Sequence, residues 1–234
     1  MKKAIVLVSG GLDSATVCAI AKEQNFELYG LSFDYGQRHK IELECGKKII
    51  KFFNFKDHRI ANIDLRIFGN SALTSEIAVP KSSQSYQTNE VKNIPVTYVP
   101  ARNTIFLSYA LAYGEVIQAF DIFIGVNALD YSGYPDCREE YIQAYQAMAN
   151  LATASTVNKE NHFVIHAPLK NMDKKTIIQT GVNLGVDYSL THSCYDPEII
   201  DDKIISCGQC DSCRIRLHGF AMAKLKDSII YKIS

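Results

Sequence analysis

A turn rich in glycine and serine, close to the N-terminus, most constrains what this chain can fold into. The turn spans residues 9–14 and reads SGGLDS. It follows the apolar run 4–8, which predicts a buried strand, and precedes residues 15–21, whose small apolar side chains predict a buried helix. The first N–H groups of a helix lack partners and the helix dipole makes that end partly positive, which favours an anion. We interpret the turn as a phosphate site, with an ordinary tight turn and an N-cap serine as the alternative.

Two common nucleotide-binding motifs do not fit this turn. A Walker A loop ends in Gly-Lys-Ser/Thr and a dinucleotide fold carries GxGxxG, and the turn has neither. Its pattern, Ser-Gly-Gly-x-Asp-Ser, resembles the PP-loop of the ATP pyrophosphatase superfamily. The resemblance implies an enzyme that activates a carboxylate or carbonyl as an adenylate and releases pyrophosphate. Gly10 and Gly11 would let the backbone approach a phosphate closely.

Size and charge narrow the class of protein. With 234 residues, of which 47% are apolar, the chain suits one α/β domain with an appendage or two small domains. Its 25 Lys and Arg balance its 25 Asp and Glu, which argues against binding of nucleic acid through the overall field. The sequence shows neither an apolar run of membrane-spanning length nor a signal-peptide pattern. We therefore expect a cytoplasmic protein with a small-molecule substrate and neither membrane nor nucleic acid as a partner.

Apolar runs and amphipathic stretches alternate along most of the chain. Strands are predicted over residues 4–8, 28–34, 59–64, 121–126 and 163–167. Helices are predicted over residues 15–21, 40–53, 104–120, 139–154 and 174–184. The alternation predicts an α/β fold with a doubly wound, Rossmann-like parallel sheet over residues 1–188, and ligands beyond the carboxyl ends of its strands.

One segment interrupts this alternation. Residues 66–94 lose the periodic pattern, and residues 71–90 are rich in Ser, Thr, Gln and Asn. Long loops in compact domains are commonly functional, so we predict a mobile loop or a lid that orders on substrate. A plain surface insertion is the alternative. The stretch 95–100 that follows is predicted to be extended.

Four of the seven cysteines gather near the C-terminus with the spacing C-x12-C-x2-C-x2-C, and they are Cys194, Cys207, Cys210 and Cys213. Tetrahedral Zn²⁺ takes four such ligands, and the last two would lie at the start of a helix over 212–224, where thiolate is favoured. We predict a structural zinc site in residues 189–234, with an iron–sulfur cluster or a redox dithiol as alternatives. Cys18 and Cys45 are predicted core residues. Cys137, in a polar loop, is the one remaining candidate for a reactive thiol, although loop packing is favoured.

Polar loops follow several predicted strands and should meet above the phosphate turn, because the carboxyl ends of parallel strands lie at one edge of a sheet. They carry cations that suit a polyphosphate, carboxylates that suit Mg²⁺ or a purine edge, and aromatic rings that suit stacking. These loops are residues 34–39, 102–103 and 127–138, together with Lys170.

Six motifs occur in order along the chain: SGGLDS at 9–14, FDYGQRH at 33–39, VPARN at 99–103, GYPDCR at 133–138, SCY at 193–195 and CGQCDSCR at 207–214. Together they resemble the 7-cyano-7-deazaguanine synthase (QueC) family of queuosine biosynthesis. The resemblance implies an adenine nucleotide alpha-hydrolase-like fold with a small C-terminal zinc-binding region. It implies an ATP-dependent ligase that converts 7-carboxy-7-deazaguanine and ammonia to 7-cyano-7-deazaguanine through an activated acid and an amide.

The resemblance also implies roles for individual residues at the matching positions. The catalytic residues would be Ser9, Asp13, Ser14, Arg102 and Lys170, the last two stabilising departing phosphates. ATP, with Mg²⁺ neutralising its charge, would be bound by Leu7, Val8, Ser9, Gly10, Gly11, Leu12, Asp13, Ser14 and Phe33. The deazaguanine would be held by Arg38, Asp130, Tyr134, Asp136 and Arg138, because carboxylates pair with a guanine-like edge and arginine with a carboxylate.

Other classes of protein stay open at this point. A PP-loop enzyme that modifies tRNA, by thiolation or lysidine formation, would need a basic face or an RNA-binding domain. A zinc-ribbon interaction module would leave the phosphate turn unexplained, and an amide-forming nucleotide synthetase (NAD or GMP type) would lack the cysteine tail. Helices rich in Tyr and Ile exceed what one core buries, which favours a homodimer.

Overall fold

Five parallel strands form the centre of the computed structural model, which describes residues 1–82, 94–127, 134–158 and 161–232. The strands are β1 (Lys3–Leu7), β2 (Glu27–Asp34), β3 (Asp57–Asn62), β4 (Asp121–Phe123) and β5 (Val164–His166). Their order in the sheet is β3-β2-β1-β4-β5, and each pair of neighbours is parallel. This confirms the predicted doubly wound α/β class.

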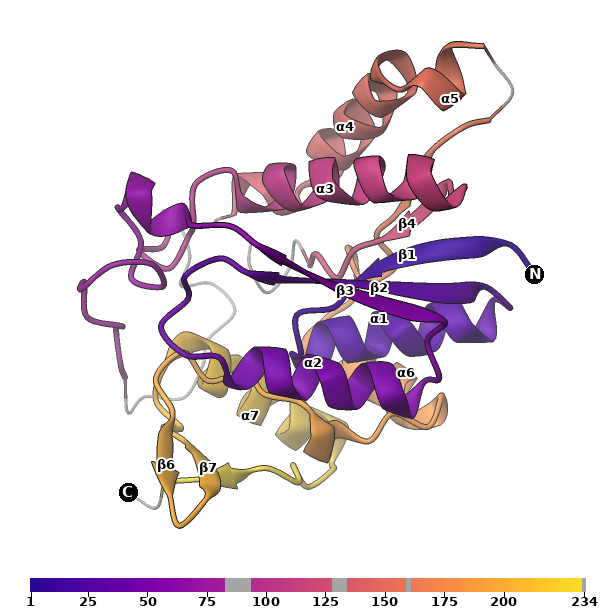
Figure 1. The fold of residues 1–234 in the computed structure, drawn as a ribbon. Helices are drawn as coiled ribbons and strands as arrows, with labels where there is room; N and C mark the ends of the chain where they lie inside the picture. Colours follow the sequence, from indigo (N-terminus) through magenta and orange to yellow (C-terminus); the bar gives the residue numbers. More distant parts are fainter. Residues whose placement is uncertain (83–93, 128–133, 159–160, 233–234) are drawn as a thin grey trace.

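Helices cover both faces of this sheet (Figure 1). One face carries α1 (Leu12–Glu23), α2 (Ile41–Phe52) and α6 (Lys174–Asn183), and the other α3 (Arg102–Ile117), α4 (Glu139–Ala152) and the short α5 (Ala154–Val157). The pleat of β1 explains why both faces are buried. Ala4 and Val6 pack in the core beneath α1, whereas Ile5 and Leu7 pack in the core beneath α3.

The strand order fixes where a ligand can bind. From β1 the chain moves outward through β2 to β3, and it then returns across the sheet to β4 and β5. The connections that leave β1 and β4 therefore diverge, and a crevice opens between them at the carboxyl edge of the sheet. The phosphate turn predicted at residues 9–14 begins two residues after β1 ends and lies at this crevice.

The C-terminal region forms a small unit beside α2 and α6 (Figure 1). It contains α7 (Asp211–Ala223) and a second sheet of β6 (Glu198–Ile200), β7 (Lys203–Ser206) and β8 (Ile230–Tyr231). The sequence analysis predicted the helix but missed the strands. The signal was present, since Asp201 and Asp202 take φ of 48° and 59° between two Ile-Ile pairs, as the tight turn of a hairpin requires.

Part of the segment 66–94 is packed against the rest of the protein, although other described residues in it, such as Ile67 and Phe68, are exposed. It begins next to a 3-10 helix, η1 (Leu65–Phe68), and Ser71 and Ala72 are both 0% exposed. Ala72 packs against the C-terminal cysteines, and Lys81 forms a bridge with Cys210. The segment thus joins the sheet domain to the cysteine region. The rest of the predicted loop, residues 83–93, lies outside the described residues.

Several predicted boundaries shift for local reasons. The helix predicted over 104–120 ends at Ile117, because Gln118 adopts the left-handed conformation that closes it. The strand predicted over 121–126 ends at Phe123, and residues 95–100 form a turn, closed by the Tyr98 N–H on the Pro95 carbonyl at 2.9 Å, rather than an extended stretch. Two further 3-10 helices, η2 (Pro135–Cys137) and η3 (Tyr188–Leu190), were not predicted.

Across the described residues, every helix is too short or too polar to cross a bilayer.

A buried arginine fastens the C-terminal region to the sheet domain. Arg216 of α7 is 2% exposed, and its guanidinium donates to the two carboxylate oxygens of Asp227 at 2.7 and 2.9 Å. It also donates to the hydroxyls of Thr191 and Ser193 and to the carbonyl of Tyr188. One side chain therefore joins α7, the chain after it and the segment that precedes Cys194.

We expect Asp227→Ala to lower the free energy of unfolding by about 3–5 kcal/mol, because it leaves the Arg216 charge buried without its counter-ion. Chemical denaturation followed by circular dichroism measures this. Glu198→Ala is the matched control, since Glu198 pairs with Lys232 at the surface and such pairs contribute at most about 1 kcal/mol. Equal losses in the two variants would contradict the anchoring role.

Candidate active site

The predicted phosphate turn begins α1 without a side-chain cap. Gly11 is the N-cap residue, and its N–H donates to Ser9 Oγ at 3.2 Å. Ser9 Oγ lies 3.1 Å from Ser14 Oγ. The N–H groups of Leu12, Asp13 and Ser14 find no acceptor among the residues that the structure describes. Ser14 Oγ in turn donates to the Gly11 carbonyl at 3.0 Å. The turn therefore presents free backbone donors at the positive end of α1, the arrangement that an anion site needs.

Gly10 is enclosed by two other segments of the chain. Its φ is +92°, and a Cβ at this position would lie 2.0 Å from the carbonyl oxygen of Glu42 on α2. On its other side, the Gly10 carbonyl accepts from the His192 N–H at 2.9 Å. Only glycine fits both the conformation and the contact. The turn is therefore held between α2 and the segment that leads to Cys194.

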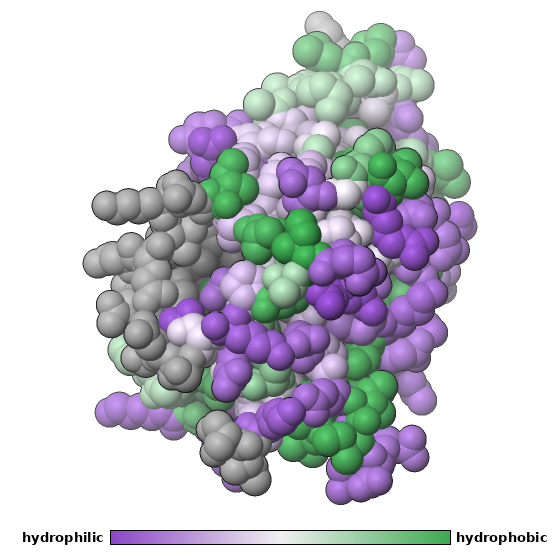
Figure 2. Space-filling view, turned by 90° about the vertical axis from the view of Figure 1, so that its left-hand side faces the viewer, coloured by the Kyte–Doolittle hydropathy of each residue, from purple (hydrophilic) through white to green (hydrophobic). Residues whose placement is uncertain are grey.

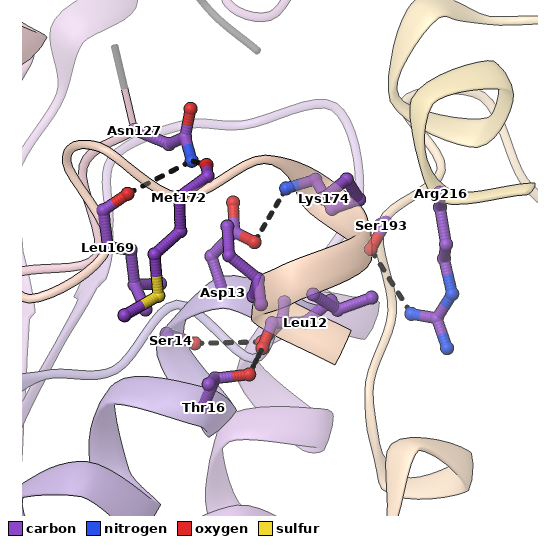
Figure 3. A network of polar contacts seen from close by, with 12 residues as sticks. Leu12, Asp13, Ser14, Thr16, Asn127, Leu169, Met172, Lys174, Ser193 and Arg216 are labelled. Atoms are coloured by element: carbon purple, nitrogen blue, oxygen red, sulfur yellow. Dashed lines mark hydrogen bonds and ion pairs between the residues drawn. The ribbon is translucent and has the colours of Figure 1, made fainter. Parts of the chain in front are cut away.

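A lysine that the sequence analysis missed lies at the turn. Lys174, at the start of α6, is buried and places Nζ 2.6 Å from Asp13 Oδ1 (Figure 3). Its stem packs on α7, where a Cβ at Gly219 would lie 2.4 Å from Lys174 Cγ. Its position in the sequence could have indicated this role, because Lys174 directly follows the N-cap residue Asp173 and lies in the first turn of the helix after β5, the last strand of the main sheet.

A cavity of about 220 Å³ opens above the turn at the carboxyl edge of the sheet. Figure 2 views the molecule from the side at which the loops after β2 and β3 lie, and shows hydrophobic and hydrophilic side chains mixed on that surface. The titratable side chains that line the cavity come from seven segments of the chain and are Asp13, Tyr35, Arg38, His39, Glu42, Arg102, Tyr134, Cys137, Lys174, His192, Tyr195 and Arg216. Cations and carboxylates thus share one enclosed space with aromatic rings, which suits a charged, purine-like ligand.

Arg102, predicted as catalytic, begins α3 and lines this cavity. Burial disfavours its charge, but attraction by Tyr35 and Asp136 outweighs burial and raises the pKa of Arg102 above its ordinary value. Asp136 also accepts from the Asn103 N–H at 3.1 Å, which places a carboxylate at the positive end of α3. The cavity therefore keeps a fixed positive charge opposite the phosphate turn.

The motif at 133–138 divides between two surfaces. Tyr134 and Cys137 line the cavity, and the Tyr134 hydroxyl lies 2.8 Å from that of Thr97. Asp136 and Arg138, predicted to hold the substrate, line a separate groove of about 620 Å³ instead. In the 3-10 helix η2, consecutive side chains point in different directions, so the motif cannot aim all its polar groups at one ligand.

Two predicted binding residues lie in the cavity but are already engaged. Phe33 stacks on Phe106 of α3, with ring centroids 3.8 Å apart and planes 2° from parallel. One ring face of Phe33 is therefore taken by protein. Arg38 donates to the carbonyls of Ala72 and Ile77 at 3.4 and 3.0 Å, which ties the segment after η1 to the cavity rim.

Of the remaining predicted site residues, some line the cavity and others do not. Leu7 and Val8 line the cavity beneath the turn. Lys170 is not among the residues that line it and pairs with Glu139 of α4. Its backbone follows β5 as expected, but the turn after the strand directs its side chain toward α4. Asp130 lies outside the described residues.

The four C-terminal cysteines meet as the spacing predicted. Their Sγ atoms all lie within 4.8 Å of one another, and Cys194, Cys210 and Cys213 are at most 1% exposed. Backbone N–H groups donate to Cys194 Sγ at 3.2 and 3.4 Å and to Cys207 Sγ at 3.3 and 3.5 Å. The other three thiols, Cys194 foremost, donate to Cys207 and lower its pKa. Four sulfurs this close together, three of them on buried residues and two with backbone donors that favour thiolate, fit one tetrahedral metal ion.

The other three cysteines are buried away from this cluster. Burial raises the pKa of Cys18 and of Cys45, both within helices, as expected of core residues. Burial, reinforced by Asp136, raises the pKa of Cys137 to about 12. Cys137 is therefore a neutral thiol near pH 7, in agreement with the packing role that the sequence analysis favoured.

A parallel sheet in this order, with an SGGxDS turn at its switch point, defines the PP-loop class of ATP-using enzymes. A solved 4-thiouridine synthetase, in complex with RNA and with ATP bound, shares the fold: the TM-score is 0.51 at 16% identity, over 81% of this chain and 42% of that one. The family described as "Queuosine biosynthesis protein QueC" matches residues 3–224, and the chain belongs to that family.

Curated relatives agree over nearly the full length. The 7-cyano-7-deazaguanine synthase of Desulfatibacillum aliphaticivorans is 57% identical over 230 residues, covering 98% of this chain and 97% of the relative. That of Paramagnetospirillum magneticum is 58% identical over 231 residues, covering 99% of both. The chain is therefore an enzyme of queuosine biosynthesis, as the six motifs predicted.

We expect Cys207→Ser to lose most of the metal bound by the C-terminal cluster, because a hydroxyl is a poor fourth ligand among three thiolates. Elemental analysis of the purified protein, after dialysis, should give about one metal ion per wild-type chain and far less in the variant. Cys45→Ala, which removes a buried thiol outside the cluster, should keep the full metal content. Undiminished metal in the Cys207 variant would exclude the four-cysteine site.

Proposed function

We propose that this chain is a 7-cyano-7-deazaguanine synthase: it condenses 7-carboxy-7-deazaguanine with ammonia, using ATP, and converts the resulting amide to the nitrile. The observation that carries the proposal is that the chain belongs to the QueC family and has a phosphate turn at the switch point of its parallel sheet. A carboxylate is a poor electrophile, so its oxygen must first become part of a leaving group. ATP supplies that activation to the acid and again to the amide.

The residues of the turn suit the phosphates of ATP. The free N–H groups of residues 12–14 and the hydroxyls of Ser9 and Ser14 would donate to phosphate oxygens as negative charge moves onto the leaving group. Mg²⁺ would neutralise part of that charge. Leu7 and Val8 form the apolar floor beneath the turn, and Phe33, which lines the cavity although Phe106 stacks on one face of its ring, is the candidate contact for the adenine.

Two cations face this site from opposite sides. Lys174 supports the turn through Asp13, and Arg102 lies across the cavity at the start of α3. We assign to Lys174 the phosphate-stabilising role that the sequence analysis gave to Lys170, because Lys174 lines the cavity and Lys170 pairs with Glu139 instead. Arg102 would bind the substrate carboxylate or a departing phosphate.

We infer that the metal of the cysteine cluster is a structural Zn²⁺. Four sulfurs close enough for one ion leave no open coordination position, which is typical of structural zinc.

The need for ATP and seven free thiols favour a reducing compartment, the cytoplasm. Exposed apolar side chains on the outer helices, Val116, Leu151 and Val157, favour a homodimer, which the mass of the protein in solution tests.

The direct test is mass spectrometry of the products formed from 7-carboxy-7-deazaguanine, ATP and ammonium. We expect the nitrile, with the amide as a transient species and pyrophosphate as a co-product. Omission of ammonium should abolish both nitrogen-containing products. An amide that never becomes a nitrile would refute the proposed overall reaction, and turnover of a tRNA instead of the free acid would favour a tRNA-modifying enzyme.

We expect Lys174→Ala to lower nitrile formation by about 100-fold, because a preorganised cation at the leaving group is lost and Asp13 is left unpaired beside the phosphates. Initial rates at saturating ATP measure this effect. Lys175→Ala, one position along α6 and away from the cavity, is the matched control and should keep wild-type rates. A comparable loss in Lys170→Ala with full activity in Lys174→Ala would reverse the assignment of the two lysines.

A further inference from the structure

Glu42 is an acidic residue of the cavity for which neither the motifs nor the fold class supplied a role. It lies in the first turn of α2, and its side chain lines the cavity. Its own carbonyl oxygen meets Gly10, so the residue is fixed directly against the phosphate turn. Its carboxyl shares the cavity with the phosphate turn, and the activated carbon must lie in the same cavity, because that carbon is bonded through one oxygen to the phosphate.

The two carboxyls of the described cavity lining differ sharply in their surroundings. Asp13 is held by Lys174 at 2.6 Å and serves the turn. Glu42 has neither a hydrogen bond nor an ion pair within the described part of the chain. Its carboxyl is therefore available to a ligand, although it is not on the open surface.

The groups that act electrostatically on Glu42 come from three elements. Arg102 of α3 favours its charged form, and Tyr35 after β2 and Cys45 further along α2 lie within reach of its charge. Burial outweighs the attraction of Arg102 and raises the pKa of Glu42 to about 7. A carboxyl group with a pKa near 7 can take up a proton and release it again at neutral pH, as a general base requires.

We propose that Glu42 accepts the protons that nitrogen loses when this enzyme forms its C–N bond and then its nitrile; the inference rests on the function proposed above. In the first step ammonia attacks the activated carbon, a C–N bond forms, the phosphorylated oxygen leaves with the C–O electrons, and one N–H proton passes to Glu42. In the second, the amide oxygen attacks ATP and releases pyrophosphate, and one of the two amide N–H protons passes to Glu42, which leaves a neutral imidate. The phosphorylated oxygen then leaves with the C–O electrons, and the last N–H proton passes to Glu42 as the triple bond forms. Glu42 returns each proton to water between steps.

The cavity histidines are poor alternatives for this role. The rings of His39 and His192 each place Nε2 on the carbonyl of Cys194, at 3.1 and 3.0 Å. Both rings therefore hold the segment before the cysteine cluster through Nε2. His39 Nδ1 has no partner in the described part of the chain, but burial lowers the pKa of both rings, so each is a weaker base than Glu42. Lys174 and Arg102 are cations that cannot accept a proton in these positions.

The test compares Glu42→Gln with wild type and with Glu44→Gln. Glutamine keeps the shape of Glu42 but cannot accept the proton. Glu44 lies two residues further along α2, exposed and paired with Lys47, and is the matched control. Two reactions are measured from pH 6 to 9: exchange of pyrophosphate into ATP in the presence of 7-carboxy-7-deazaguanine, which reports activation, and formation of amide and nitrile, which reports loss of protons from nitrogen.

We expect Glu42→Gln to lower kcat for amide and nitrile formation by about 100-fold or more, as loss of a general base does. Pyrophosphate exchange should fall much less, and the acid limb near pH 7 in the wild-type profile should disappear. A raised KM for the deazaguanine with unchanged kcat would instead show that Glu42 binds the guanine-like edge. An equal fall in exchange would show that it only positions the turn, and either result overturns the proposal. A wild-type enzyme that makes neither amide nor nitrile reports failure of the proposed function itself.

Discussion

The contact of Gly10 with two other segments is the constraint on which the active site depends. The turn must expose its N–H groups to a ligand, so its own backbone cannot be satisfied by a regular ladder. The carbonyl of Gly10 is satisfied by His192, and its missing Cβ admits the carbonyl of Glu42. Residues far apart in the sequence thereby fix one short turn. The sheet positions the turn, and these two contacts determine its shape.

The C-terminal region forms part of the cavity wall, to which His192, Ser212 and Arg216 contribute. His192 lies two residues before Cys194, the first cysteine of the cluster, and its N–H donates to the turn, while Arg216 and Lys174 connect α7 to the same crevice. Figure 3 shows Lys174 reaching Asp13 and Arg216 reaching Ser193 on neighbouring elements. Such a small region buries little apolar surface of its own. A buried ion pair and a four-cysteine metal site are the kinds of constraint that keep it in place.

The charged groups of the cavity differ in whether they have a partner of opposite charge. Arg102 and Lys174 line the cavity, and acidic neighbours favour their charged forms; we propose that they bind phosphate and carboxylate oxygens. Glu42 stands without such a partner and is free to change its protonation state. Asp136, which the motif suggested for the substrate, instead supports the start of α3. Nitrile formation needs both kinds of group in one enclosed space, because the oxygen must leave as an anion and the nitrogen must lose its protons.

The sequence by itself determined the sheet, the phosphate turn, the cysteine cluster and the family, because each is written in local periodicity, in fixed spacings or in contiguous motifs. Helix and strand positions follow from such patterns, and cysteines separated by two residues can place their thiols side by side, as a metal site requires. Tertiary structure alone decided which lysine reaches the turn, Lys174 rather than Lys170, which side of the motif at 133–138 faces the cavity, and that Glu42 is enclosed without a partner. The direction of a side chain depends on packing against elements distant in the sequence, and no local pattern carries that information.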